Sequence, residues 1–310
     1  MADKVLIVGH KNPDNDAISA AVAMAYFENE LAKLQGRDTE YEAVRLGPCP
    51  PETAWNLGSN GISEPRLIES VGEGDKVIMV DHSEYGQAVD GLKDAQIVGV
   101  VDHHRLGDIT TAAPLYMTVR PWGSSATVVT SIMRDHGIEI PVDIAHILLG
   151  AILTDTVIEK SPTTTPHDAM QIAYLEEITG KERVNFGQEL FRCRGREDEI
   201  HIKDYVEADS KEFTVAGKPV LIAQHETVDF EAAMAREEEA RKHMQHLIAQ
   251  HGYDFVLLFV TDILEEGSSF LVEGNHEIPD QVFGIDSSEA VWMPGVLSRK
   301  KQVAAPLLEV

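Results

Sequence analysis

Four acidic clusters in the sequence each follow a run of apolar residues, and their side chains could bind metal ions. The clusters come after VLIVG, VIMV, IVGVV and ILLGAILT, and they contain His10, Asp14, Asp16, Asp81, Asp102, His103, His104 and Asp155. In an open α/β sheet, the ends of neighbouring parallel strands converge on one crevice. Carboxylates and imidazoles gathered there would form a metal site, and their number favours more than one ion.

Each of these residues, taken alone, also has an ordinary structural explanation. Asp16 could be the N-cap of a helix, His10 a solvated loop residue, and Asp81 a turn-forming residue. These explanations weaken for the whole set, because four apolar segments would have to end in such residues independently. A buried Asp155 would be costly without a partner, and a bound cation removes that cost.

The ligand types narrow the choice of metal. Carboxylates with one or two imidazoles and no thiolate suit Mn²⁺, Co²⁺ or Zn²⁺, whereas Mg²⁺ prefers oxygen ligands and keeps several waters. A bridging carboxylate such as Asp81 could hold two ions about 3.5–4 Å apart, and a water between them would lose a proton near neutral pH. Of the adjacent pair His103 and His104, one could bind a metal while the other faces a substrate. The pattern predicts two-metal hydrolysis, most often of a phosphorus centre.

An anionic substrate needs cations, and this chain has few of them. It contains 52 Asp and Glu residues against 26 Lys and Arg, for a net charge of -26, which argues against nucleic acid as the main partner. The densest basic run is SRKK, residues 298–301. Arg299 could bind a phosphate through two hydrogen bonds, and Lys300 could act as a point charge. A solubilising or helix-terminal basic run is the alternative explanation.

The elements that must position these residues follow from the hydrophobic pattern. The first ~190 residues alternate strand-like and helix-like segments, which is typical of a parallel α/β sheet. The predicted strands are Val5–Gly9, Glu40–Arg45, Lys76–Asp81 and Gln96–Asp102. The predicted helices are Ala17–Gln35, a segment capped by Ser124 or Ser125 and ended by Gly137, Asp143–Thr154 and Thr165–Gly180.

The pattern changes after this part of the chain. Ala216–Pro219 is a hairpin signal between two strand-like segments. A long charged helix is predicted over Phe230–His251, and further strands over Phe255–Val260, Ser269–Val272 and Val282–Ile285. We therefore expect a metal-binding domain over residues 1–188, a hinge over 189–196, and a smaller α/β domain with a mixed sheet over 197–310. The active site is expected in the cleft between the two domains.

Other features bear on the cellular setting. The two cysteines, Cys49 and Cys193, make neither a disulfide framework nor a zinc-thiolate site, and they fit a reducing cytoplasm. No apolar run reaches the ~20 residues of a membrane helix, and the N-terminus lacks the cleavage pattern of a secretion signal. We expect a cytoplasmic protein without a membrane partner.

Together, the motifs GHKNPDNDA, VDHSE, VDHH, LTDT and SRKKQV resemble those of the family II inorganic pyrophosphatases, within the DHH phosphoesterase superfamily. The DHH motif marks only the superfamily, whereas SRKKQ resembles the DHHA2-type C-terminal domain. RecJ-like nucleases and oligoribonucleases carry a glycine-rich, His-containing motif instead, which this sequence lacks. The resemblance covers nearly the whole chain and implies hydrolysis of inorganic diphosphate to two phosphates by a metal-bridged hydroxide.

The resemblance also implies a role for each motif residue. Two Mn²⁺ or Co²⁺ ions per subunit are implied, with additional Mg²⁺ or Mn²⁺ entering with the substrate. The implied ligands of the first ion are His10, Asp14 and Asp81, and those of the second are Asp16, Asp81, His103 and Asp155. The residues implied to bind the substrate and assist catalysis are His104, which could transfer a proton, and Lys211, Arg299 and Lys300. A homodimer formed through the N-terminal domains is also implied.

The sequence departs from the family pattern at two positions. Asn15 stands where Thr is more usual, and Ser83 where Asn is frequent, so hydrogen bonds behind the ligands could differ.

The sequence also leaves two alternative functions open. The first alternative is another DHH phosphoesterase that acts on polyphosphate or short nucleotides. The second is a catalytically silent module that binds a metal or a nucleotide, against which the complete set of ligand positions argues.

Overall fold

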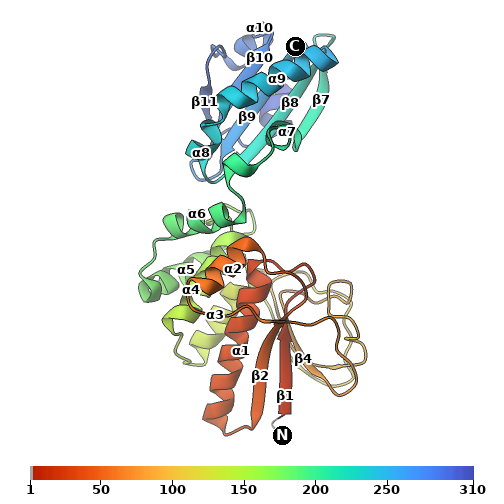
Figure 1. Cartoon of the computed structure of the whole chain (residues 1–310), viewed down its shortest axis with the longest axis vertical. Coiled ribbons are helices and arrows are strands. Elements are labelled where there is room, and N and C mark those ends of the chain that lie inside the picture. Colours follow the sequence, from red (N-terminus) through yellow and green to blue (C-terminus); the bar gives the residue numbers. More distant parts are fainter. Residues whose placement is uncertain (1–2) are drawn as a thin grey trace. The chain divides into compact units, whose positions relative to one another are not determined.

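The structure is a computed structural model that describes residues 3–310, and the chain divides into two compact units (Figure 1). The first unit is Met1–Arg194 and the second is Gly195–Val310. None of the helices between residues 3 and 310 combines the length and the hydropathy that a membrane span requires.

The first unit is built on a six-stranded parallel sheet with the order β3-β2-β1-β4-β5-β6. Its strands are β1 (Asp3–Val8), β2 (Thr39–Arg45), β3 (Arg66–Leu67), β4 (Lys76–Val80), β5 (Gln96–Asp102) and β6 (Tyr116–Val119). The direction of winding reverses between β1 and β4, and ligands of open α/β sheets bind at the carboxyl ends of the strands at such a point. The predicted parallel sheet is confirmed, and the short strands β3 and β6 are additional to the prediction.

Six helices accompany this sheet in the described part of the first unit. They are α1 (Asn15–Gln35), α2 (Pro51–Gly58), α3 (Ser125–Asp135), α4 (Val142–Asp155), α5 (Pro166–Thr179) and α6 (Arg183–Arg194). The alanine-rich α1 packs against β2, α3 and α4, because its small side chains allow a close approach. The helices predicted in this part of the chain are confirmed.

Local signals in the sequence fix the ends of the helices nearest the acidic clusters. The side chain of Asp14 accepts a hydrogen bond from the backbone N–H of Ala17 and so caps α1, at 2.9 Å. Ser124 caps α3, and Gly137 follows that helix with a φ of 64°. The N-cap of α1 is therefore Asp14 rather than Asp16, which leaves the carboxylate of Asp16 for other contacts.

The segment expected to contain the hinge is partly helical. Residues 188–194 belong to α6, and the boundary between the two units follows Arg194. The predicted domain limits and the hinge over 189–196 stay predictions.

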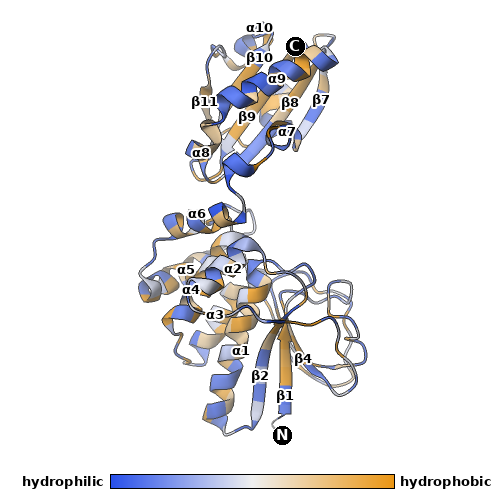
Figure 2. Ribbon diagram, viewed as in Figure 1, coloured by the Kyte–Doolittle hydropathy of each residue, from blue (hydrophilic) through white to orange (hydrophobic). Residues whose placement is uncertain are grey.

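The second unit contains a five-stranded mixed sheet with the order β11-β10-β9-β8-β7, in which only β8 and β9 are parallel. Its strands are β7 (Ser210–Val215), β8 (Lys218–Thr227), β9 (Phe255–Asp262), β10 (Gly267–Gly274) and β11 (Val291–Pro294). Figure 2 shows the apolar character of β1 and β9, and every residue of β9 is buried. The predicted mixed sheet and α/β fold are confirmed, including the hairpin at Ala216 and Gly217, which both have positive φ.

The helices of the second unit correct two predictions. They are a 3₁₀ turn (Glu197–Glu199), α7 (Ile202–Glu207), α8 (Phe230–Met234), α9 (Glu237–His251), α10 (Glu277–Phe283), a π-helix (Arg299–Ala304) and α11 (Ala305–Leu307). The long helix predicted over Phe230–His251 is two helices, and the break lies at Arg236, whose guanidinium donates to the carbonyls of Glu197 and Ile200.

The strand predicted over Val282–Ile285 is wrong, because that segment begins inside α10. Ile278 and Val282 lie one helical turn apart and pack together on the core of the second unit. Gly284 ends the helix with a φ of 66°.

Candidate metal centre

The residues predicted to bind metal meet at the carboxyl edge of the parallel sheet. Asp81 directly follows β4, and His103 directly follows β5. His10 lies in the loop between β1 and α1, and Asp16 lies in the first turn of α1. Asp155 is the last residue of α4, so the fourth cluster ends a helix that terminates at the same edge as the strands.

Three groups of potential ligands form within this cluster. They are His10, Asp14 and Asp81; Asp16, His103 and Asp155; and Asp81, His103 and His104. In each group, one ligand atom from every residue lies within 4.8 Å of the others. The structure therefore brings together all seven residues that the sequence placed at the metal ions or beside them.

Asp81 directs one carboxylate oxygen to each of two neighbouring groups. Its Oδ2 lies 3.3 Å from Nε2 of His10, which is 3.6 Å from Oδ2 of Asp14. Its Oδ1 lies 3.3 Å from Nε2 of His103, which is 3.5 Å from Oδ2 of Asp155. This arrangement suits a carboxylate shared by two cations.

The two imidazoles are oriented for metal binding. Nδ1 of His10 donates to the carbonyl of Lys11 at 2.8 Å, and Nδ1 of His103 donates to the carbonyl of Trp122 at 3.0 Å. A carbonyl can only accept, so Nδ1 carries a hydrogen in both rings and Nε2 is the atom turned toward the carboxylates. Nε2 of His103 is buried and has no hydrogen-bond partner within residues 3–310. The donor set fits a divalent metal.

The charges in this centre call for cations. Burial and the charge of Asp81 raise the pKa of Asp16 and of Asp155 well above the usual value. Burial lowers the pKa of His10 and His103, but their carboxylate neighbours outweigh it and raise these pKa values to about 11 and about 10. Burial also opposes the ionisation of Asp81, yet the neighbouring imidazoles of His10 and His103, each 3.3 Å away, hold its pKa well below the usual range. Protons on both imidazoles therefore offset the carboxylates at neutral pH, and a metal must displace them.

Backbone and hydroxyl groups at the start of α3 hold two of the carboxylates. The N–H groups of Ser125 and Ala126 donate to the two oxygens of Asp16, at 2.6 and 2.9 Å. The hydroxyl of Ser125 donates to Oδ1 of Asp81 at 2.8 Å. The sequence analysis recognised Ser125 only as a candidate helix cap, because no local pattern connects it with residues far earlier in the chain.

Asn15 lies buried behind the centre and connects three helices. Its side-chain amide donates to Thr154 at 3.2 Å and accepts from Ser19 and Asn56. It thereby joins α1 to α4 and α2, next to Asp14 and Asp16 at the start of α1 and close to Asp155 at the end of α4. Ser83 has a comparable role between loops, because its hydroxyl donates to the carbonyl of Arg105 and accepts from the N–H of Gly107.

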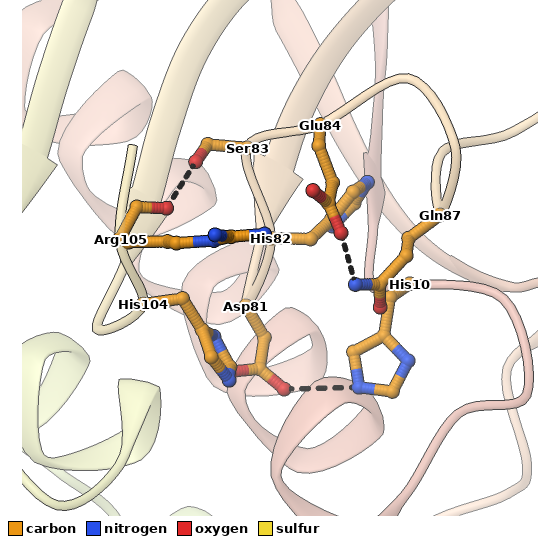
Figure 3. A pocket seen from close by; sticks show the side chains of 8 residues that line it. All are labelled: His10, Asp81, His82, Ser83, Glu84, Gln87, His104 and Arg105. Atoms are coloured by element: carbon orange, nitrogen blue, oxygen red, sulfur yellow. Dashed lines mark hydrogen bonds and ion pairs between the residues drawn. The ribbon is translucent and has the colours of Figure 1, made fainter. Parts of the chain in front are cut away.

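A pocket opens beside the centre (Figure 3). Its lining residues are His10, Asp81, His82, Ser83, Glu84, Gln87, His104 and Arg105. The rings of His10 and His104 approach Asp81 from opposite sides in this view. The side chain of His104 is 53% exposed, and its Nδ1 lies 3.0 Å from Oδ1 of Asp102.

Asp102 organises the turn that carries both histidines. Its Oδ1 accepts hydrogen bonds from the N–H groups of His103 and His104 as well as from Nδ1 of His104. The sequence analysis gave this residue no role of its own, although the DHH triplet contains the signal.

The predicted substrate-binding cations belong to the second unit. Nη1 of Arg299 lies 2.5 Å from Oδ1 of Asp209, two residues before Lys211 on β7. Lys300 is exposed in the π-helix, and no acidic side chain within residues 3–310 pairs with it. The carbonyl oxygen of the Gln302 side chain accepts from the N–H groups of Leu297 and Ser298, so this glutamine shapes the loop before the basic run. Contact of these cations with a substrate stays a prediction.

Comparison with known proteins covers both units. Residues 4–152 match the DHH family, N-terminal domain, and residues 188–310 match the DHHA2 domain. A probable manganese-dependent inorganic pyrophosphatase from Archaeoglobus fulgidus is 39% identical over 99% of this chain and 98% of its own length. The manganese-dependent inorganic pyrophosphatase of Methanocaldococcus jannaschii is 36% identical over 97% of each chain.

One solved structure shows the same relationship, and a second shares the fold. A putative family II inorganic pyrophosphatase from Methanococcus jannaschii has a TM-score of 0.59 at 36% identity and covers 99% of this chain and 98% of its own. An exopolyphosphatase-related protein from Bacteroides fragilis has a TM-score of 0.53 at 15% identity, with coverage of 99% and 92%. This second likeness concerns the fold alone.

Proposed function

Because the chain belongs to the family II, manganese-dependent inorganic pyrophosphatases, with a DHH domain followed by a DHHA2 domain, we propose that it hydrolyses inorganic diphosphate to two phosphates. The structural observation that carries the proposal is the position of Asp81, which offers one oxygen to each of two Asp–His groups. That geometry supports hydrolysis by a pair of cations.

The proposed centre holds two Mn²⁺ or Co²⁺ ions per subunit. The ligands proposed for the first ion are His10, Asp14 and Asp81, and those for the second are Asp16, Asp81, His103 and Asp155. When bound, such ions supply positive charge to the phosphate oxygens and acidity to the attacking water. An additional Mg²⁺ or Mn²⁺ is proposed to enter with the diphosphate, whose own charge it would offset.

His104 is proposed to contact the substrate and to carry a proton. Its Nδ1 is held by Asp102, so Nε2 is the ring nitrogen left for a phosphate oxygen. The half-exposed ring lines the pocket next to Asp81, which supports this role. A residue in this position could pass a proton to or from the reacting phosphate.

Arg299, Lys300 and Lys211 are proposed to neutralise the negative charge of the diphosphate. Arg can bind two oxygens of one phosphate, and Lys supplies a mobile positive charge. The charge that develops on the departing phosphate would be stabilised most by cations already in place. The exposure of Lys300 and its lack of an acidic partner in the described chain support its availability for an anion.

The proposal extends to the setting of the enzyme. We propose a cytoplasmic homodimer formed through the first unit, with no nucleic-acid or membrane partner. The unpaired cysteines support the cytoplasm, and the excess of acidic residues argues against nucleic acid.

A substrate panel tests the proposed activity. Phosphate release is measured from diphosphate, tripolyphosphate, a dinucleotide and a nitrophenyl phosphate ester, each with Mn²⁺-loaded enzyme and again after chelation. Diphosphate is expected to be clearly preferred, and chelation is expected to abolish its hydrolysis. Preference for tripolyphosphate or the dinucleotide would instead support another DHH phosphoesterase, and no turnover of any substrate would support a silent binding module.

A further inference from the structure

Asp168 is a fully buried carboxylate that lies outside the proposed ligand set. It accepts hydrogen bonds from the N–H and the hydroxyl of Thr165, at 2.7 and 2.6 Å, and so completes the capping box of α5. Capping alone does not account for its remaining contacts. Both of its oxygens also accept from the N–H of Gly123, at 3.0 and 2.9 Å, and Oδ1 accepts from the hydroxyl of Thr127 at 2.6 Å.

One peptide group connects Asp168 to a proposed metal ligand. The N–H of Gly123 and the carbonyl of Trp122 belong to the same planar peptide unit. Asp168 binds the N–H, and Nδ1 of His103 donates to the carbonyl at 3.0 Å. The carboxylate therefore fixes the direction of the carbonyl that orients the imidazole of His103, and it polarises that carbonyl as an acceptor.

The same turn continues into α3, where it contacts two more proposed ligands. The backbone N–H groups of Ser125 and Ala126 bind Asp16, and the hydroxyl of Ser125 binds Asp81. Thr127, in the first turn of α3, is the residue whose hydroxyl donates to Asp168. Movement of this turn would therefore displace three ligands of the centre together.

The close approach of Gly123 to Asp168 leaves no room for adjustment. A Cβ atom at Gly123 would lie 2.8 Å from Oδ2 of Asp168 and 2.7 Å from the side-chain methyl of Thr156. A side chain at position 123 would therefore force the turn and Asp168 apart.

We propose that Asp168 is a positioning residue for the metal centre. It fixes the turn of residues 122–126, which in turn orients His103, Asp16 and Asp81. This inference rests on the proposed metal-binding function and assigns to that site a residue of α5, a helix that carries none of the proposed ligands. Because partners behind metal ligands typically change metal affinity by about 10–100-fold, its loss should weaken metal binding by that order.

The variant Asp168→Asn tests the inference without a change in side-chain size. An amide nitrogen replaces one carboxylate oxygen and turns N–H groups toward the N–H of Gly123, which lies within 3.0 Å of both oxygen positions. In addition, either Thr165 or Thr127 loses its acceptor, depending on which oxygen is replaced. Mn²⁺ affinity, measured by calorimetry in the absence of substrate, is expected to fall about 10–100-fold. The visible absorption bands of the Co²⁺-loaded protein are expected to shift, because the ligand geometry changes.

Thr165→Val is the matched control. It removes the capping hydroxyl from the same carboxylate but leaves the contacts with Gly123 and Thr127. It should lower the melting temperature while leaving Mn²⁺ affinity and the Co²⁺ spectrum as in the wild type. If Asp168→Asn fails to fold, Thr127→Val carries the test, since it removes one of the two residues that tie the turn to Asp168, keeps the contact with Gly123 and keeps the cap of α5. Its Mn²⁺ affinity is expected to fall, by a smaller factor than in Asp168→Asn.

The outcomes separate this inference from the proposed function. The positioning role would be overturned if Asp168→Asn kept the wild-type Mn²⁺ affinity and Co²⁺ spectrum. If that variant is unfolded, wild-type Mn²⁺ affinity in Thr127→Val would overturn it. An equal loss of affinity in Thr165→Val would also overturn it, because the effect would then belong to general destabilisation. Absence of Mn²⁺ binding by the wild-type protein would instead refute the proposed metal centre.

Discussion

Replacement of Asp81 by Asn is expected to remove bound metal and to reduce diphosphate hydrolysis by on the order of 10³-fold or more. Each oxygen of Asp81 faces a different imidazole, at 3.3 Å, so both proposed ions depend on this side chain. The catalytic contribution of bound metal is several kcal/mol, and each 1.4 kcal/mol corresponds to a factor of ten in rate. The measurements are the metal content per chain after dialysis and the rate of phosphate release.

Asp75→Asn provides a matched control at the opposite end of the same strand. Asp75 immediately precedes β4, whereas Asp81 immediately follows it, and the exposed side chain of Asp75 accepts only the N–H of Gly72 among the described contacts, at 2.8 Å. This substitution keeps a carbonyl oxygen for that bond and should leave metal content and activity unchanged. If Asp81→Asn retained its full metal content and near wild-type activity, the bridging role of Asp81 would be wrong.

Replacement of Lys300 by Ala is expected to reduce diphosphate hydrolysis by about 10²–10³-fold, which is the usual loss when one group that stabilises the developing charge is removed. Lys300 is exposed and belongs to the second unit, so its loss should not disturb the fold or the proposed ligands. Phosphate release and metal content are measured on the same preparation. The expected result is a large loss of rate with unchanged metal.

Lys301→Ala is the control for this change. Lys301 is the next residue of the π-helix, is also exposed and carries the same charge, but is not proposed to contact the substrate. It should lower the rate only slightly. Equal losses for the two variants would indicate a nonspecific effect of charge, and loss of metal from Lys300→Ala would mean that the role of the basic run is misassigned.

The fold was predictable wherever the spacing of apolar residues in a segment fitted only a strand or only a helix. The segments that form β4 and β5 are continuous apolar runs, as expected for strands buried on both faces of a parallel sheet. The segment Val282–Ile285 misled the prediction because its apolar residues suit a strand as well as a helix. The contacts of Ile278 and Val282 with a distant core decide between the two, and no local pattern contains them.

The candidate site was predictable in residue type more than in geometry. The sequence indicated which carboxylates and imidazoles would gather, because strand ends and helix ends converge at one edge of the sheet. The direction of each ligand depends on long-range hydrogen bonds instead. Asp168 looks in sequence like an ordinary capping residue in TPHD, and only the fold brings it to the peptide group before Gly123.

Titration of metal-free protein with Mn²⁺, followed by phosphate release from diphosphate, tests the central claim most directly. Metal must displace protons from His10 and His103, whose pKa values are raised to about 11 and about 10. The protons on these two imidazoles contribute fully to the stability of the metal-free fold below the ordinary histidine pKa of about 6.5. This contribution is lost as the pH rises through the raised pKa values. Apparent Mn²⁺ affinity should therefore increase from pH 6 to pH 8.

The account predicts that the metal-free protein releases no phosphate and that activity reaches its plateau when two Mn²⁺ ions are bound per chain. Activity that survives complete removal of metal, or that reaches its plateau at one ion per chain, would contradict the two-ion centre bridged by Asp81.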